Sequence, residues 1–143
     1  IPQNSPLFNS FYKFQPEENI VVPYIDKPQL HWLKTELNAK DDDVEIIFMH
    51  IPFTKASADP GSSHELFSLL LSHPSLKLVL AGHHHRNLIQ RYPRENGPDL
   101  NQVETDALAK TPENWRLIRL TANSILVSAP GNTTSELVIP VKP

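Results

Sequence analysis

The chain has 143 residues and a formal net charge of −3. This length allows one domain with its own core, and the small charge argues against a broad basic surface for nucleic acid. The absence of cysteine excludes disulfides and thiolate metal sites, and no apolar run reaches the length of a membrane span. Because the chain begins with Ile-Pro-Gln-Asn, we expect that it is processed or part of something longer. The compartment and the oligomeric state stay open, with the cytoplasm slightly favoured.

The first 27 residues are rich in proline and aromatic residues, which predicts ordered loop with a short edge strand at residues 20–22. The first clear helix follows. Pro28 suits the first helical position and Asp26 suits the cap before it. Leucines at positions 30, 33 and 37 form an apolar stripe, so we expect an amphipathic helix of about three turns that ends near Asn38.

Two apolar strands are predicted at residues 44–49 and 76–81, with a helix between them that starts at Ser62 and stops before Pro74. His50 follows the first strand. Gly82 ends the second strand, because glycine tolerates backbone conformations that other residues avoid. A helix in the crossover favours parallel neighbouring strands. Parallel strands bring both carboxyl ends to one edge, so we expect His50 to meet the histidines at 83–85.

The rest of the chain differs in its residue pattern, with a polar stretch followed by short apolar runs. Residues 87–92 predict a further strand, whereas residues 93–113 are polar and predict a long loop with a helical turn near residues 103–108. Three short strands are then expected in a meander, at residues 115–121, 124–129 and 136–141.

The histidines at the two strand ends indicate a metal site, because imidazole is the commonest protein metal ligand. His83 and His85 are two residues apart and can point in different directions, so they need not bind the same ion. A nitrogen set of this kind, with His50, suits zinc, iron or manganese. For His84 we expect a supporting or substrate contact, and for Arg86 a phosphate oxygen or solvent. The alternative is a polar surface loop without a metal.

Three motifs resemble the calcineurin-like metallophosphoesterases. They are Gly-His-His-His at residues 82–85, which matches G-H-x-H, His-Ile-Pro at residues 50–52, which matches H-x-P, and the helix start at residues 25–33, which matches I-D-x-x-Q-L-x-W-L. The resemblance implies a mixed-sheet α/β fold, the four-layer α/β/β/α sandwich, and a phosphoesterase with two divalent metal ions (Mn, Fe or Zn). It also implies that His50 and His83 bind one ion and His85 the other, and that two ions clamp a phosphate and activate water.

Three further motifs of that family, D-x-H, G-D-x-x-D and G-N-H-[DE], are absent. Residues 1–143 therefore resemble the C-terminal half of one such domain. We expect the upstream half to be a partner that supplies the leaving-group acid, and this chain to be inactive alone. The phosphoester substrate stays open. The alternatives are a non-catalytic scaffold or single-metal module, and a mononuclear zinc hydrolase of another family that places His50, His83 and His85 on one ion.

Overall fold

The computed structural model describes residues 12–15, 20–23, 25–39, 44–53 and 62–141. The fold is mixed α/β, as predicted. The chain divides into two compact units, one formed by Ile1–Asp41 and Phe53–His73 and the other by Asp42–Pro52 and Pro74–Pro143. That residues 1–143 form the C-terminal half of a larger domain stays a prediction. In the described residues, no helix combines the length and the apolar character that crossing a membrane requires.

The first unit contains a strand pair and two helices. Strands β1 (Tyr12–Gln15) and β2 (Ile20–Pro23) pair in antiparallel fashion. The strand predicted at residues 20–22 is confirmed, whereas β1 lies where a loop was predicted. The helices are α2 (Lys27–Leu37) and α3 (Ser62–Ser72), close to the predicted bounds.

Helix α2 begins as its sequence predicts. The Asp26 carboxylate accepts a hydrogen bond of 2.8 Å from the Gln29 backbone N–H, which satisfies one of the free donors of the first turn. Asn38 closes the other end, where its side-chain amide donates to the Lys34 carbonyl at 2.6 Å. The three leucines of the apolar stripe are buried, and the rest of the helix is exposed.

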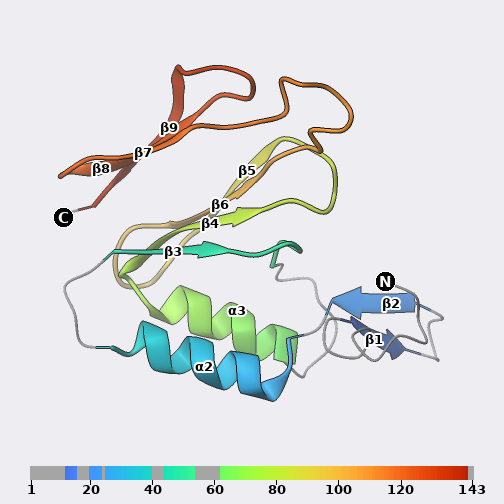
Figure 1. The fold of residues 1–143 in the computed structure, drawn as a ribbon. Coiled ribbons are helices and arrows are strands. Elements are labelled where there is room, and N and C mark those ends of the chain that lie inside the picture. Colours follow the sequence, from blue (N-terminus) through green and yellow to red (C-terminus); the bar gives the residue numbers. More distant parts are fainter. Residues whose placement is uncertain (1–11, 16–19, 24, 40–43, 54–61, 142–143) are drawn as a thin grey trace. The chain divides into compact units, whose positions relative to one another are not determined.

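The second unit contains a four-stranded sheet with the order β3-β4-β6-β5 (Figure 1). Its strands are β3 (Glu45–Phe48), β4 (Leu76–Ala81), β5 (Leu88–Tyr92) and β6 (Leu100–Glu104). Strands β3 and β4 are adjacent and parallel, as predicted. Strand β6 is parallel to β4 on its other side, and β5 is antiparallel to β6. Both strands that precede the histidines therefore end at the same edge.

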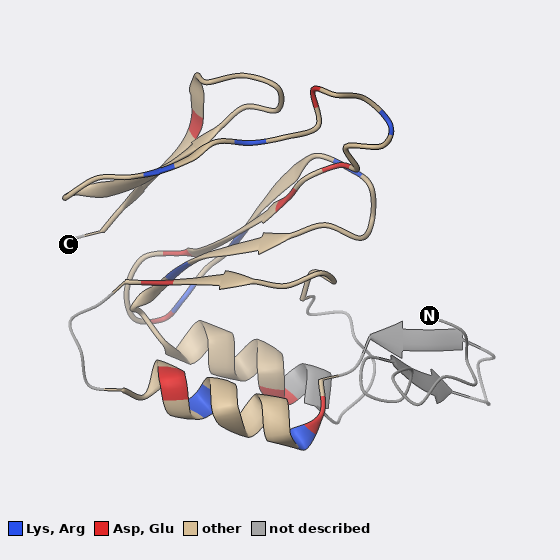
Figure 2. Ribbon diagram, in the orientation of Figure 1, with Lys and Arg blue, Asp and Glu red and all other residues tan. Residues whose placement is uncertain are grey.

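A three-stranded antiparallel meander completes this unit, with β7 (Ile118–Leu120), β8 (Ser124–Ser128) and β9 (Ser135–Pro140). The prediction of a meander is confirmed, with a shorter first strand. The two sheets share one core, in which the buried side chains are Leu78, Val103, Ile125, Val127, Leu137 and Ile139. Acidic and basic residues are interspersed along the described elements of the chain (Figure 2).

The loop predicted at residues 93–113 is interrupted by β6, which occupies an interior position in the sheet, and the rest of that segment is loop. Residues 103 and 104, where a helical turn was predicted to begin, belong to this strand. All five residues of β6 are buried, and three of them are polar: Asn101, Gln102 and Glu104. A buried strand usually reads as an apolar run. The polar residues of β6 hide that pattern, and side-chain hydrogen bonds compensate their burial.

Candidate metal centre

The ends of β3 and β4 are tied together by their backbones. The Met49 N–H donates to the Leu80 carbonyl at 3.0 Å, which extends the ladder beyond β3. One step further, the Gly82 N–H donates to the His50 carbonyl at 3.1 Å. These bonds fix the distance between the two chain segments at the point where each one delivers a histidine.

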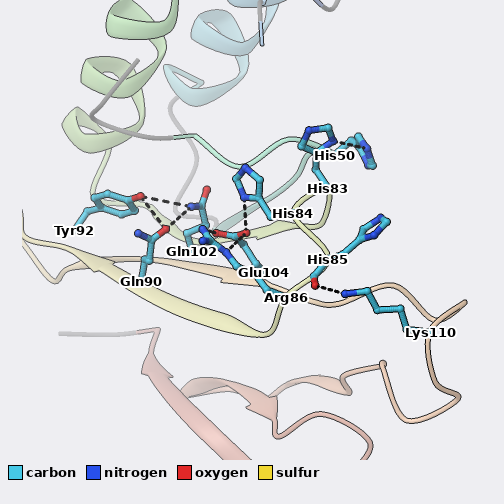
Figure 3. Close-up of polar contacts among 10 residues, drawn as sticks. All are labelled: His50, His83, His84, His85, Arg86, Gln90, Tyr92, Gln102, Glu104 and Lys110. Atoms are coloured by element: carbon cyan, nitrogen blue, oxygen red, sulfur yellow. Dashed lines mark hydrogen bonds and ion pairs between the residues drawn. The ribbon is translucent and has the colours of Figure 1, made fainter. Parts of the chain in front are cut away.

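His50 and His83 meet at this edge, so their predicted convergence is confirmed. His50 Nε2 and His83 Nδ1 lie 3.2 Å apart, and the rings are nearly perpendicular with centroids 5.1 Å apart (Figure 3). Two nitrogens bound to one tetrahedral zinc ion at about 2.05 Å would be separated by about 3.3 Å. The pair therefore fits two ligand positions on a single ion.

The surroundings of His83 favour the neutral imidazole. Burial lowers the pKa of His83, and the neighbouring rings of His50, His84 and His85 lower it further. A neutral ring keeps a lone pair that can bind a metal, since a histidine must lose its second proton before it becomes a ligand.

The turn after β4 has an unusual backbone. His83 and His85 adopt the left-handed region, with φ of 65° and 52°. Gly82 is not among the described residues with positive φ, although β4 does end before it. The prediction that the strand ends at Gly82 is confirmed, whereas the left-handed conformation belongs to the histidines that follow it. Each left-handed residue that carries a Cβ costs about 1–2 kcal/mol, so other contacts must hold this turn.

His85 lies apart from the His50–His83 pair (Figure 3). Its carbonyl accepts a hydrogen bond of 2.6 Å from Lys110 Nζ, and Lys110 pairs with Asp106 at 3.0 Å. In the parts of the chain that the structure describes, no group of three or more His, Cys, Asp or Glu side chains is placed to hold one metal ion. The alternative with three histidines on one ion is thus not formed by this arrangement.

Glu104, at the end of β6, was not identified from the sequence. Its side chain is 1% exposed. One carboxylate oxygen accepts from His84 Nδ1 at 2.8 Å and from Arg86 Nε at 3.0 Å, and the other accepts from Arg86 Nη2 at 2.8 Å. No local pattern marks this residue, because its partners come from a loop that precedes it by about 20 positions.

A shallow apolar hollow lies beside His50. Its volume is about 400 Å³, and its lining consists of Phe48, Met49, His50, Leu80 and Ala81. The Phe48 side chain is 78% exposed. The histidine pair therefore borders an open, largely apolar surface at the tips of β3 and β4.

Comparison with known proteins places this fold. No protein-family model and no curated protein matches the sequence. Among solved structures, the chain is similar to a dimetal phosphatase from Danio rerio, with a TM-score of 0.65 and 23% sequence identity. The match covers 84% of this chain and 40% of that protein, so the chain spans less than half of its length. At this identity the likeness establishes the fold: the chain has the fold of part of a dimetal phosphatase.

Proposed function

We propose that this chain is the histidine-bearing, C-terminal part of a metal-dependent phosphoester hydrolase, either a phosphatase or a phosphodiesterase. The observation that carries the proposal is the 3.2 Å approach of His50 Nε2 and His83 Nδ1 at the carboxyl ends of two parallel strands. Ligand sites in α/β sheets form at such ends. The fold shared with a dimetal phosphatase supports the reaction class.

In this proposal His50 and His83 hold one divalent ion (Mn, Fe or Zn), and His85 contributes to a second. Divalent ions held there would supply Lewis-acid polarisation of a phosphoryl oxygen and a water of lowered pKa. The role of this chain is to hold neutral imidazole nitrogens in fixed positions. His84 and Arg86 are 45% and 51% exposed. The N–H groups of Arg86 that do not bind Glu104 can donate to a phosphate oxygen, and His84 can do so through Nε2 when its ring carries both protons.

The charge of the site indicates that further, negatively charged ligands are needed to hold a metal ion. Two neutral imidazoles do not offset the charge of a divalent ion. The nearby carboxylates of Glu104 and Asp106 are already paired with Arg86 and Lys110. The proposal therefore assigns the carboxylate ligands and the leaving-group acid to an upstream half of the same domain.

A second candidate is a module that binds a single metal ion without catalysis. One observation favours it: in the described residues two imidazoles meet, and no third ligand joins them. The two candidates differ in turnover and in the number of bound ions rather than in fold.

The test compares His83→Ala with His31→Ala in the protein purified with all the sequence that its gene encodes upstream. His31 is an exposed histidine of α2 and serves as the matched control. Loss of a direct ligand should abolish Co²⁺ binding at the His50 site and lower hydrolysis of a chromogenic phosphodiester by orders of magnitude. His31→Ala should match the unaltered protein. Bound metal without turnover of phosphomonoesters or phosphodiesters would favour the second candidate, and unchanged Co²⁺ binding in His83→Ala would contradict both.

A further inference from the structure

We propose that Glu104 is a positioning residue that holds the histidine loop, residues 82–87, in the shape needed to bind metal. The proposal rests on the proposed function, because it concerns the same metal site. It assigns a role to a buried carboxylate that touches neither of the paired imidazoles.

The sheet places Glu104 directly beside the start of the loop. In the parallel pairing of β4 with β6, Glu104 is the register partner of Ala81, the last residue of β4. The following backbone bond, from the Thr105 N–H to the Ala81 carbonyl at 3.0 Å, continues this pairing to the strand end. The carboxylate therefore lies in a fixed position at the point where the loop leaves the sheet.

All the hydrogen bonds of the Glu104 carboxylate within the described structure go to this loop. Its partners, His84 and Arg86, are the residues on either side of His85. Anchoring both neighbours of one residue to the same buried group restricts the backbone between them. This attachment explains how His85 keeps its left-handed φ of 52° without glycine.

The same attachment determines which way the histidines face. With His84 and Arg86 held on Glu104, the ring of His83 lies against His50, and His85 lies apart from both (Figure 3). Lys110 holds the loop from the other side through the His85 carbonyl at 2.6 Å. The ligand nitrogens are thus set before any metal arrives, which lowers the ordering cost of binding.

The test uses Glu104→Gln, with Gln102→Met as the matched control. Gln102 lies two residues earlier on the same face of β6 and is fully buried. Its side-chain amide donates to Gln90 Oε1 at 3.2 Å and to the Tyr92 hydroxyl at 3.5 Å (Figure 3). The control therefore removes a buried polar group of similar size from the same strand and changes neither Glu104 nor the two residues that donate to its carboxylate. A third variant, Arg86→Met, removes two of the three hydrogen bonds from the exposed side, so it tests the attachment even if Glu104→Gln fails to fold.

Two measurements are made on each variant. In the metal-free protein, ¹⁵N NMR of the histidine rings reports where His84 carries its proton. A carboxylate only accepts, so His84 Nδ1 must be protonated in the unaltered protein, and Glu104→Gln should release this preference and shift the His83 and His85 signals. In Co²⁺ titrations, loss of such a supporting partner should weaken binding by about 10–100-fold. Arg86→Met should weaken it as well, and Gln102→Met should not.

The outcomes separate the two proposals. Unchanged His83–His85 signals and unchanged Co²⁺ affinity in Glu104→Gln and Arg86→Met would overturn the role of Glu104, and so would equal losses in Gln102→Met. If the unaltered protein bound no Co²⁺, the proposed function would fail. The NMR comparison would then still decide whether Glu104 holds the loop.

Discussion

The Glu104 carboxylate illustrates how one buried charge is accommodated. Moving an ion of this kind out of water costs several kcal/mol unless its oxygens find partners. Arg86 provides two parallel hydrogen bonds and His84 a third, so both oxygens are occupied. Because Arg86 is half exposed, most of its own hydration survives. The ion pair therefore costs Arg86 little hydration, and it fixes the orientation of the Glu104 carboxylate.

This pairing predicts a dependence of stability on acid. Burial raises the pKa of Glu104, but hydrogen bonds and charge from Arg86 and His84 lower it by more, so it lies below its ordinary value of 4.5. The unfolded chain therefore binds a proton more readily than the folded one. The stabilisation is present above about pH 4.5 and is lost as the pH falls through the lowered pKa of the folded state.

Denaturant unfolding between pH 7 and pH 3, with and without Glu104→Gln, measures this contribution. The substitution should lower the free energy of unfolding by about 1–3 kcal/mol near neutral pH, and by progressively less in acid. A difference between the two proteins that stayed constant over this range would contradict the assigned pKa shift.

At the scale of elements, Gly131 and Gly82 both lie at turns, but they have different roles. Gly131, in the connection between β8 and β9, has φ of 63°. A Cβ there would come within 2.7 Å of Glu113 Cβ and 2.9 Å of its carbonyl oxygen. Gly82 has no positive φ, and a Cβ there would meet ordinary contacts at 3.9 and 4.0 Å. The turn of the meander requires its glycine, and the histidine loop does not.

Alanine substitutions should separate the two cases. Gly131→Ala should destabilise the protein by more than about 1 kcal/mol, because the native backbone is incompatible with a side chain. Gly82→Ala should be neutral or slightly stabilising, by up to about 1 kcal/mol, through the reduced freedom of the unfolded chain. Thermal unfolding of the two variants checks this expectation, and the reverse order of stability would refute it.

At the scale of the whole molecule, the second unit depends on one core between its two sheets. Leu78 and Val103 come from neighbouring strands of the larger sheet, and Ile125, Val127 and Ile139 from the meander. Because β4 carries both Leu78 and, at its end, the histidine loop, packing of the sheets supports the position of the candidate metal centre.

Truncation in this core should cost far more than truncation on the outer surface. Leu78 is completely buried, so Leu78→Ala should lower the free energy of unfolding by about 2–5 kcal/mol through lost burial and a residual cavity. Val138 of β9 is 58% exposed, and Val138→Ala should stay within about 0.5 kcal/mol. Denaturant unfolding of both variants provides the measurement; similar losses would mean that the two sheets do not share a core.

Sequence alone determined the features that depend on local patterns and on short connections. Leucine spacing and the Asp26 cap predicted α2, apolar runs predicted β3 and β4, and the helical crossover predicted their parallel pairing. The approach of His50 to His83 followed, because parallel strands end at one edge. Each of these inferences uses residues that are near in sequence or joined by a single crossover.

Only the tertiary structure decided the features in which a buried polar residue finds its hydrogen-bond partners far away in the sequence. Strand β6 reads as a polar loop because Asn101, Gln102 and Glu104 occupy buried positions, and a buried polar residue is acceptable only once its partners are present. The partners of Glu104, His84 and Arg86, lie 20 and 18 positions away. The left-handed conformation of His83 and His85 likewise cannot be read from the sequence. The residues that bind this loop, Glu104 and Lys110, lie 20 and 25 positions from their partners His84 and His85.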